Sequence, residues 1–299
     1  MKYLLFFCCI WVTELMAFDY QLKAERINPS TYVVLGAQED FTPANGGALA
    51  NIAFVVTAES VVLIDAGPSK KYGEQLRALI RSITHKPLSH LILTHAHPDH
   101  FLASAAFADI AIIASDATRA QIEQEGPDYN ANMFRLVLDA MKGTQVHVPP
   151  KAALPETLRI GGHVFKLMRM AGHSKADLVV LDENTGTLFT GDLVFHGRTP
   201  TTPHADLRAW QNSLQDLRTL PFRQLVPGHG PVATDLKPIG FTADYLTWLD
   251  HTLSQAARQG KDPAEILHTN PPMPMAVFRA EFARSVAHLY PRYEQAILK

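Results

Sequence analysis

The sequence predicts an α/β fold in which two β-sheets carry helices on their outer faces. Short apolar runs alternate with segments of helical spacing, the pattern of strand, helix, strand units. Glycine followed by a polar residue closes several of the runs, as expected where a strand ends and the chain turns sharply. An apolar fraction of 47% and a charged fraction of 19% are typical of a globular protein.

The first half of the chain predicts one sheet with its helices. The expected strands are residues 32–36, 51–57, 60–64, 88–93 and 110–114, and the turn Ala58-Glu59 joins two of them as a hairpin. The expected helices are residues 72–83, with apolar Leu76, Leu79 and Ile80 at helical spacing, then 101–107 and 116–141. We expect residues 123–132 to interrupt the last helix, because Gly126-Pro127 breaks a helix.

The second half predicts another sheet and the C-terminal helices. The expected strands are residues 164–170, 178–182, 187–189 and 224–226, and the expected helices are 206–220, 241–251 and 275–298. Pro271-Pro272-Met273-Pro274 separates the last two helices. We expect no domain boundary within residues 18–299, so that these helices belong to one domain and form a small cap over one side of the cleft.

The segment His95-Ala96-His97-Pro98-Asp99-His100 follows the apolar run 88–93 directly. His is the commonest protein ligand for zinc-like metals, and three protein ligands with one open position is the usual catalytic arrangement. Side chains alternate along an extended segment, so His95 and His97 point the same way and can bind one ion together. Pro98 turns the chain, which would direct Asp99 and His100 toward a second ion beside the first.

Two ions need more ligands than this segment supplies, and the second half offers three at the ends of predicted strands. They are His173 in Ala171-Gly172-His173-Ser174, Asp192 in Phe189-Thr190-Gly191-Asp192, and His229 in Val226-Pro227-Gly228-His229-Gly230. Glycine precedes each of them and lets the backbone approach a ligand closely. Their shared position at strand ends makes them candidate ligands together with the first segment.

The order of these motifs resembles the five-motif signature of the metallo-β-lactamase-fold hydrolases. The resemblance also includes Asp65, in Val62-Leu63-Ile64-Asp65-Ala66-Gly67, as a buried structural residue that bonds the metal loop. It implies a four-layer αβ/βα sandwich and two divalent metal ions. By resemblance, one metal would be bound by His95, His97 and His173, the other by Asp99, His100 and His229, and Asp192 would bridge both.

Longer stretches are similar to one subgroup, the periplasmic quinoprotein relay system zinc metallohydrolases. The similarity lies in Asn45-Gly46-Gly47, Asp65-Ala66-Gly67-Pro68-Ser69, Gly191-Asp192-Leu193-Val194-Phe195-His196 and Thr201-Thr202-Pro203-His204-Ala205-Asp206. Members of this subgroup accompany quinone-cofactor dehydrogenases. The similarity therefore implies a quinoprotein dehydrogenase as a partner, and it leaves the substrate open.

The N-terminus independently predicts export. Lys2, a nearly unbroken apolar run over residues 4–12 and Leu15-Met16-Ala17 form a signal peptide of residues 1–17. The run is too short to span a bilayer, so we expect a periplasmic or secreted protein without a stable membrane anchor; a buried N-terminal strand is the alternative. Both cysteines, Cys8 and Cys9, fall within this segment and would be removed with it.

The charge balance argues against nucleic acid as a partner. The 27 basic and 29 acidic residues nearly cancel, and no arginine-rich stripe is present. We expect a small-molecule substrate instead.

The chemistry follows from the ligand set. Two adjacent dications lower the pKa of a shared water so that hydroxide exists at neutral pH, and they polarise the oxygen of the group under attack. We expect this hydroxide to attack an ester, thioester, lactone or amide carbonyl, with Asp99 as a catalytic residue that orients it and moves a proton to the leaving group. The ligands suit zinc, iron and manganese, and their softness favours zinc.

Other histidines are given separate roles. His196 and His204 lie in the loop after Asp192 and are candidate substrate-binding residues, with a surface position as the alternative. The remaining histidines lack partner spacing and are expected to be structural or solvated: His85, His90, His147, His163, His251, His268 and His288.

Three alternative functions remain open at this point. The true β-lactamases that the chain resembles carry Cys or Ser where it has Asp192, whereas a bridging carboxylate resembles the hydroxyacylglutathione hydrolases, which are thioesterases. Those hydrolases are usually cytosolic and bind glutathione through basic C-terminal residues, whereas this tail is not conspicuously basic and the N-terminus predicts export. The third alternative is a non-catalytic metal-binding accessory of a quinoprotein dehydrogenase system. Asp99 and Asp192 favour an enzyme, since four ligands without a bridging carboxylate would close a structural site.

Overall fold

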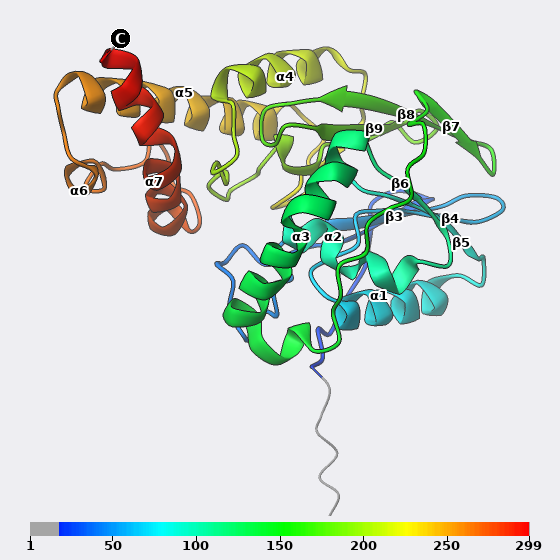
Figure 1. Cartoon of the computed structure of the whole chain (residues 1–299). Helices are drawn as coiled ribbons and strands as arrows, with labels where there is room; N and C mark the ends of the chain where they lie inside the picture. Colours follow the sequence, from blue (N-terminus) through cyan, green and yellow to red (C-terminus); the bar gives the residue numbers. More distant parts are fainter. Residues whose placement is uncertain (1–17, 299) are drawn as a thin grey trace, which may run out of the picture.

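The computed structural model describes residues 18–298 (Figure 1). The predicted signal peptide, with Cys8 and Cys9, lies outside the described residues. None of the helices in the described part of the chain is long and apolar enough to cross a membrane.

The first sheet has six strands in sequence order. They are β1 (Glu25–Arg26), β2 (Thr31–Val34), β3 (Ile52–Val56), β4 (Val61–Ile64), β5 (Leu88–Ile92) and β6 (Ala111–Ile113). Strands β1 to β4 pair antiparallel, and the predicted hairpin joins β3 and β4 with Val56 opposite Val61. Strands β4, β5 and β6 are parallel, so the chain crosses back through helices, first α1 (Lys70–Ile83) and then α2 (Pro98–Phe101) with a 3₁₀ turn (Leu102–Phe107).

Helix α1 shows why the local sequence forms a helix. The Ser69 side chain accepts a hydrogen bond from the backbone N–H of Tyr72 and so caps the N-terminus. Tyr72, Leu76 and Ile80 follow at intervals of four and are buried against the first sheet.

The second sheet has five strands, also in sequence order. They are β7 (Thr157–Ile160), β8 (His163–Met170), β9 (Asp177–Asp182), β10 (Thr187–Phe189) and β11 (Gln224–Val226). All pairs are antiparallel except β10 and β11, which are parallel and connected through α4 (Leu207–Thr219).

The predicted four-layer α/β architecture is confirmed. Val55 of β3 and Ile64 of β4 meet Leu178 and Val180 of β9 in a core between the sheets. The alternate side chains of these strands, such as Phe54, pack outward against helices. Figure 1 shows α1 beneath the first sheet and α4 above the second.

Helix α3 (Asp116–Val137) corrects one prediction, because it runs without a break through Gly126-Pro127. Pro127 removes one backbone hydrogen bond, but it does not end the helix. Ile122, Gly126 and Met133 lie on one buried face, and a Cβ on Gly126 would come within 2.8 Å of Val146. Packing of this face therefore outweighs the local preference of the Gly-Pro pair.

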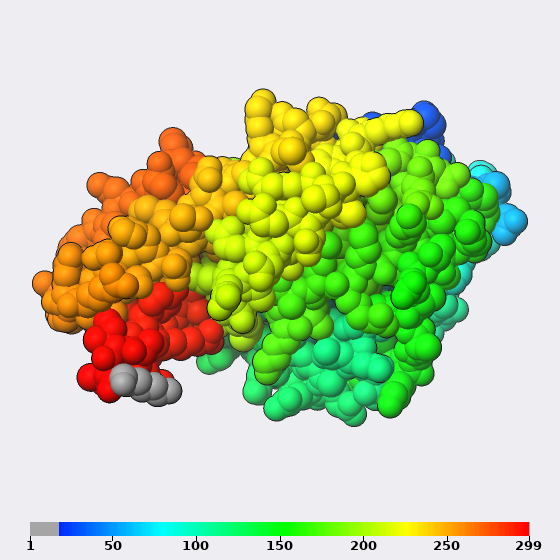
Figure 2. Space-filling view, turned by 90° about the horizontal axis from the view of Figure 1, so that it is seen from above, coloured from blue at the N-terminus to red at the C-terminus, as the bar shows by residue number. Residues whose placement is uncertain are grey.

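The C-terminal helices α5 (Lys237–Arg258), α6 (Pro263–Ile266) and α7 (Phe278–Ile297) gather at one end of the molecule, orange and red in Figure 2. Leu246 and Leu249 of α5 pack with Phe282 and Leu289 of α7 in the core that covers the outer face of the second sheet. Strands β1 and β7 and helix α6 were not predicted, because each has at most four residues and too few apolar positions for a period.

Candidate metal centre

The predicted ligands come from loops that follow β5, β8, β10 and β11. After β5 the chain stays extended to His97, and Pro98 then occupies the first position of α2. The turn of α2 carries Asp99 and His100 into the interior, where both are buried.

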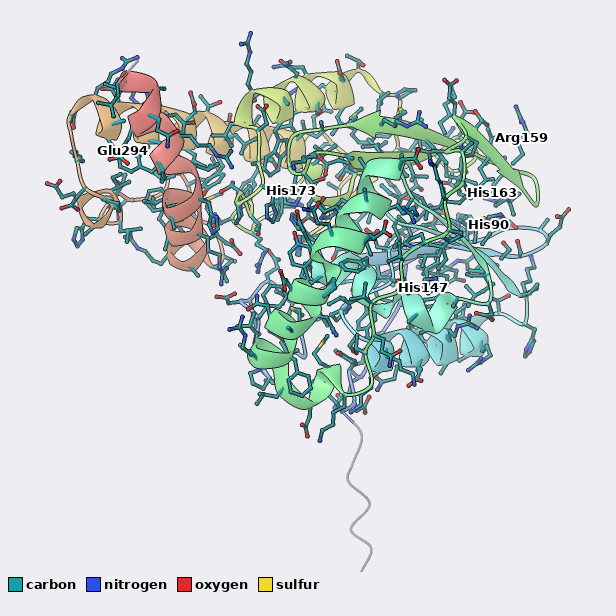
Figure 3. All side chains as sticks on the ribbon, viewed as in Figure 1. His90, His147, Arg159, His163, His173 and Glu294 are labelled. Atoms are coloured by element: carbon teal, nitrogen blue, oxygen red, sulfur yellow. The ribbon has the colours of Figure 1, made fainter. Side chains whose placement is uncertain are left out.

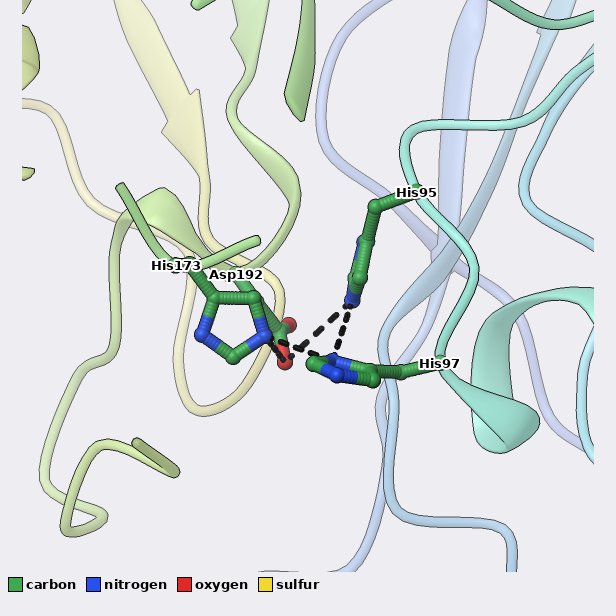
Figure 4. A group of neighbouring side chains, drawn as sticks. All are labelled: His95, His97, His173 and Asp192. Carbon is green, nitrogen blue, oxygen red and sulfur yellow. Dashed lines mark hydrogen bonds and ion pairs between the residues drawn. The ribbon is translucent and has the colours of Figure 1, made fainter. Parts of the chain in front are cut away.

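A first group consists of His95, His97, His173 and Asp192, whose ligand atoms lie within 4.8 Å of one another (Figure 4). Nδ1 of His97 lies 3.0 Å from Nε2 of His95 and 2.7 Å from Nε2 of His173. Oδ2 of Asp192 lies 3.3 Å from Nε2 of His173 and 3.8 Å from Nε2 of His95. The atoms thus face one common centre.

A second group consists of Asp99, His100 and His229. Oδ2 of Asp99 lies 3.5 Å from Nε2 of His229. The other carboxylate oxygen of Asp192, Oδ1, lies 3.1 Å from Nε2 of His100 and 3.3 Å from Nε2 of His229. Asp192 therefore presents one oxygen to each group.

These distances fit metal binding. Ligand atoms about 2.1 Å from a tetrahedral zinc ion are about 3.4 Å apart, and the observed separations bracket that value. Nε2 of His100 and Oδ1 of Asp192 are buried and, although they lie 3.1 Å apart, they are not aligned for a hydrogen bond with each other or with any other described residue. Buried polar atoms normally have a hydrogen-bond partner, so two buried atoms without one are consistent with a cation binding between them.

The electrostatics of the first group favour neutral imidazoles. Burial and the neighbouring histidines hold the pKa of His95 and His97 well below the usual value. Burial likewise lowers the pKa of His173 to about 4, despite the opposing effect of Asp192. Unprotonated imidazole is the form that binds a metal, so these ligands need lose no proton at neutral pH.

The second group contains a histidine, His100, whose pKa is raised instead of lowered. Burial lowers the pKa of His100, but Asp192, Asp65 and Asp99 outweigh it and raise the pKa well above the usual value. Burial raises the pKa of Asp192, but His229, His100 and His173 outweigh it, so the carboxylate is ionised. A cation binding here would take the place of the proton on His100.

Asp65 supports the loop in the way that the resemblance implied. Its Oδ1 accepts the backbone N–H of Thr94 at 2.8 Å, and its Oδ2 accepts Oγ1–H of Thr94 at 2.8 Å and Nδ1–H of His100 at 2.7 Å. The backbone of Asp65 has φ of 60°, a strained conformation for a residue with a side chain. The bond to Nδ1 leaves Nε2 of His100 free to face the second group.

Two glycines allow the close approach that the motifs predicted. A Cβ on Gly228 would lie 2.0 Å from Oδ1 of Asp192, and a Cβ on Gly172, where φ is 142°, would lie 2.2 Å from Cα of Trp210. Trp210 is fully buried, and its ring packs edge-on against His173 at 5.0 Å. Glycine is therefore required directly before both His229 and His173.

One cavity, of about 170 Å³, reaches both groups, and we call it the site cavity. The described residues that line it are Phe41, His97, Pro98, Asp99, Asn132, Leu136, Asp192, Arg198, Thr201, Pro203, His204, His229, Glu281 and Arg284. Four larger hollows, of about 250 to 570 Å³, are lined by described residues that include none of the seven predicted ligands.

The two candidate substrate-binding histidines differ in position. His204 lines the site cavity, and its Nδ1 lies 2.9 Å from Nε2 of His97. His196 is not among the described residues that line the cavity, and its Nδ1 lies 2.9 Å from the carbonyl oxygen of Pro231. In Figure 3, His90, His147 and His163 lie apart from His173, in agreement with the structural or solvated roles expected for them.

Sequence reasoning missed an ion-pair network in the cavity wall. Arg198 is buried with Nη2 3.1 Å from Oε1 of Glu281, and Arg284 binds both Glu281 and Asp40. Helix α7 thus supplies two residues of the cavity wall, Glu281 and Arg284. Glu281 lies far from Arg198 in sequence on an amphipathic helix, and no sequence signal marks such a pair.

The sandwich and its paired His and Asp groups together define the metallohydrolase class of proteins. The model of the metallo-β-lactamase superfamily matches residues 45–229, more than half of the sequence. The chain therefore belongs to the metallo-β-lactamase superfamily, which confirms the prediction made from its motifs.

Similar proteins include named hydrolases. An atrochrysone carboxyl ACP thioesterase of Cryptosporiopsis sp. is 26% identical over 71% of the chain, which spans 58% of that protein's length. A probable metallo-hydrolase of Streptococcus pyogenes is 29% identical over 62% of the chain and 80% of that protein. Among solved structures, a metallo-β-lactamase from Pontibacter korlensis matches with a TM-score of 0.61 at 23% identity, covering 76% of this chain and 99% of that one. At this identity the structural likeness concerns the fold.

Proposed function

We propose that the chain is a binuclear metal-dependent hydrolase that cleaves a carbonyl substrate, with a thioester as the first candidate and an ester, lactone or amide as the others. The observation that carries the proposal is Asp192, whose two oxygens face two different buried groups beside one cavity. The first group would hold one ion and the second group the other. Zinc is the ion we propose, although iron and manganese also suit these donors.

Bound metal ions and residues of the site cavity would divide the catalytic work between them. Two bound dications would supply an activated water and polarise the carbonyl oxygen of the substrate. Asp99 belongs to the second group and also lines the site cavity, so its carboxylate is placed to orient the water and to pass a proton to the leaving group. Phe41 and Leu136 line the same cavity and would exclude bulk solvent from the acyl part of the substrate.

Two considerations favour a thioester. Relatives of the chain carry the name ACP thioesterase, and a bridging carboxylate at Asp192 resembles thioesterases rather than true β-lactamases. The likeness to solved β-lactamases is one of fold and does not extend to substrate.

We also propose a setting. The apolar N-terminal run favours export to the periplasm, and the motifs around His196 and His204 are similar to those of the quinoprotein relay metallohydrolases. In that setting the substrate would arise in quinoprotein metabolism and a quinoprotein dehydrogenase would be the partner.

A hydrolysis screen of the purified full chain tests the function. Acyl thioesters, aryl esters, lactones, nitrocefin and lactoylglutathione would be assayed beside elemental analysis of the same sample. We expect two ions per chain and release of free thiol from thioesters. Active protein with less than one ion per chain would refute the metal mechanism. Fully loaded protein that hydrolyses nothing and co-purifies with a dehydrogenase would instead support the non-catalytic accessory.

A further inference from the structure

His204 contacts Nε2 of His97, the ring nitrogen opposite the one that faces the first group. Its Nδ1 lies 2.9 Å from Nε2 of His97, and the two rings are inclined by only 29° with centroids 5.2 Å apart. Nδ1 of His97, on the opposite side of that ring, faces His95 and His173. One histidine therefore bridges the first group and His204.

Binding of a metal ion to Nδ1 of His97 would determine where both rings carry their hydrogens. A neutral His97 with an ion on Nδ1 would carry its hydrogen on Nε2 and would donate from that atom to His204. Nδ1 of His204 must then accept, and the hydrogen of the neutral His204 ring must sit on its own Nε2. His204 is exposed, and its Nε2 has no hydrogen-bond partner within the part of the chain that the structure describes, so this nitrogen is open to solvent or to a bound ligand.

The loop that carries His204 is held at several points. Thr202 Oγ1 donates to Ser285 Oγ of α7 at 2.6 Å, and Arg292 of α7 donates to the carbonyl oxygen of Ala205 at 3.1 Å. The N–H of Asp206 donates to the carbonyl oxygen of Gly172, next to His173, at 2.9 Å. Helix α7 and the loop of the first group thus fix His204 relative to the ligands, as a supporting residue requires.

We infer that His204 is a positioning residue for His97 and that it also presents its Nε2–H to a hydrogen-bond acceptor of the substrate. The inference rests on the proposed function for the identity of the ion and the substrate. The acceptor would be a carbonyl or carboxylate oxygen next to the scissile group, because His204 lines the site cavity beside Asp99. The two nitrogens of one ring therefore serve two different purposes.

Two substitutions separate these purposes. In His204→Asn the side-chain oxygen replaces Nδ1 and keeps the acceptor for His97, but the Nε2 donor is lost. In His204→Gln the amide group replaces Nε2 and can still donate, but no acceptor remains at the Nδ1 position. His204→Ala removes both, and His251→Asn on the exposed face of α5 is a matched control.

Three readouts would be taken on the full chain: affinity for the first zinc ion by chelator competition, the absorption spectrum of the cobalt-loaded protein, and KM for the best thioester. We expect His204→Gln and His204→Ala to bind the first ion about 10- to 100-fold more weakly with an altered spectrum, as is typical when the partner of a ligating histidine is lost. We expect His204→Asn to keep near-normal affinity and spectrum, but to raise KM about three- to tenfold.

Normal affinity and spectrum in both His204→Gln and His204→Ala would overturn the positioning role. An unchanged KM in His204→Asn would overturn the donor role. Failure of the proposed function is a separate result, since it would be visible as absent metal or absent hydrolysis in the unmodified chain.

Discussion

Replacing Asp192 with asparagine removes the only predicted ligand that faces both groups. Asparagine keeps the volume and one oxygen, but it loses the negative charge and places an NH₂ group toward one of the ions. The carboxylate oxygens lie 3.1 and 3.3 Å from the nearest imidazole nitrogens of the two groups, so the charge would act at short range on both ions. A unit charge about 4 Å from another is worth about 4 kcal/mol at an effective dielectric constant of about 20, or about 10³ in affinity.

We therefore expect Asp192→Asn to retain about one ion per chain instead of two and to lose about 10³-fold in kcat. Elemental analysis after gel filtration and a thiol-release assay measure the two effects. Asp182→Asn is the matched control, since Asp182 is also fully buried but binds His163 and Thr185 outside both groups. Two ions per chain and an undiminished rate in Asp192→Asn would refute the bridging role.

Three further predictions concern pH, the metal loop and the core. Lowering the pH from about 7.5 to about 5.5 should release the ion of the second group first. The raised pKa of His100 makes a proton compete for Nε2 and weakens binding about tenfold per pH unit, whereas His173, with a pKa of about 4, stays unprotonated. Asp65→Ala should lower the free energy of unfolding by about 3 kcal/mol, because it leaves three buried donors unpaired; denaturant titration measures this. Trp210→Ala should cost about 4 kcal/mol in the same assay, since it empties a fully buried site and leaves the carbonyl oxygen of Leu193 without its donor.

For each of these three predictions, one result would contradict the reasoning. Simultaneous loss of both ions on acidification would contradict the difference between the two groups. Asp65→Asn, which keeps one acceptor and tolerates positive φ, should be milder than Asp65→Ala, and equal losses would count against the hydrogen-bond explanation. A Trp210→Ala protein as stable as the unmodified chain would show that the neighbouring side chains refill the site.

The sequence was most informative where one short segment held several chemical groups. The spacing of His95 and His97 predicted that they lie together, Pro98 predicted the different direction of Asp99, and glycine marked the strand ends that carry His173 and His229. Helix α3 was predicted wrongly because Gly126-Pro127 disfavours a helix locally, while the energy that maintains it comes from distant partners such as Val146. Local sequence cannot report such tertiary packing.

The ion pair in the wall of the site cavity could not be predicted from the sequence for a related reason. Arg198 and Glu281 form a buried pair between a loop and α7, and neither neighbourhood in the sequence indicates the other. His196 and His204 looked equivalent in sequence, yet backbone turns direct one to Pro231 and the other to His97. Side-chain direction within a loop depends on those turns, which composition does not specify.

The seven candidate ligands are divided between the sheets, since four follow β5 of one sheet and three follow strands of the other. Bound cations would therefore connect the loops of one sheet to the loops of the other. They would raise the free energy of unfolding in proportion to the logarithm of the free metal concentration over Kd. We expect that chelation increases amide exchange first in the four ligand-bearing loops, before it does so in the strands of either sheet.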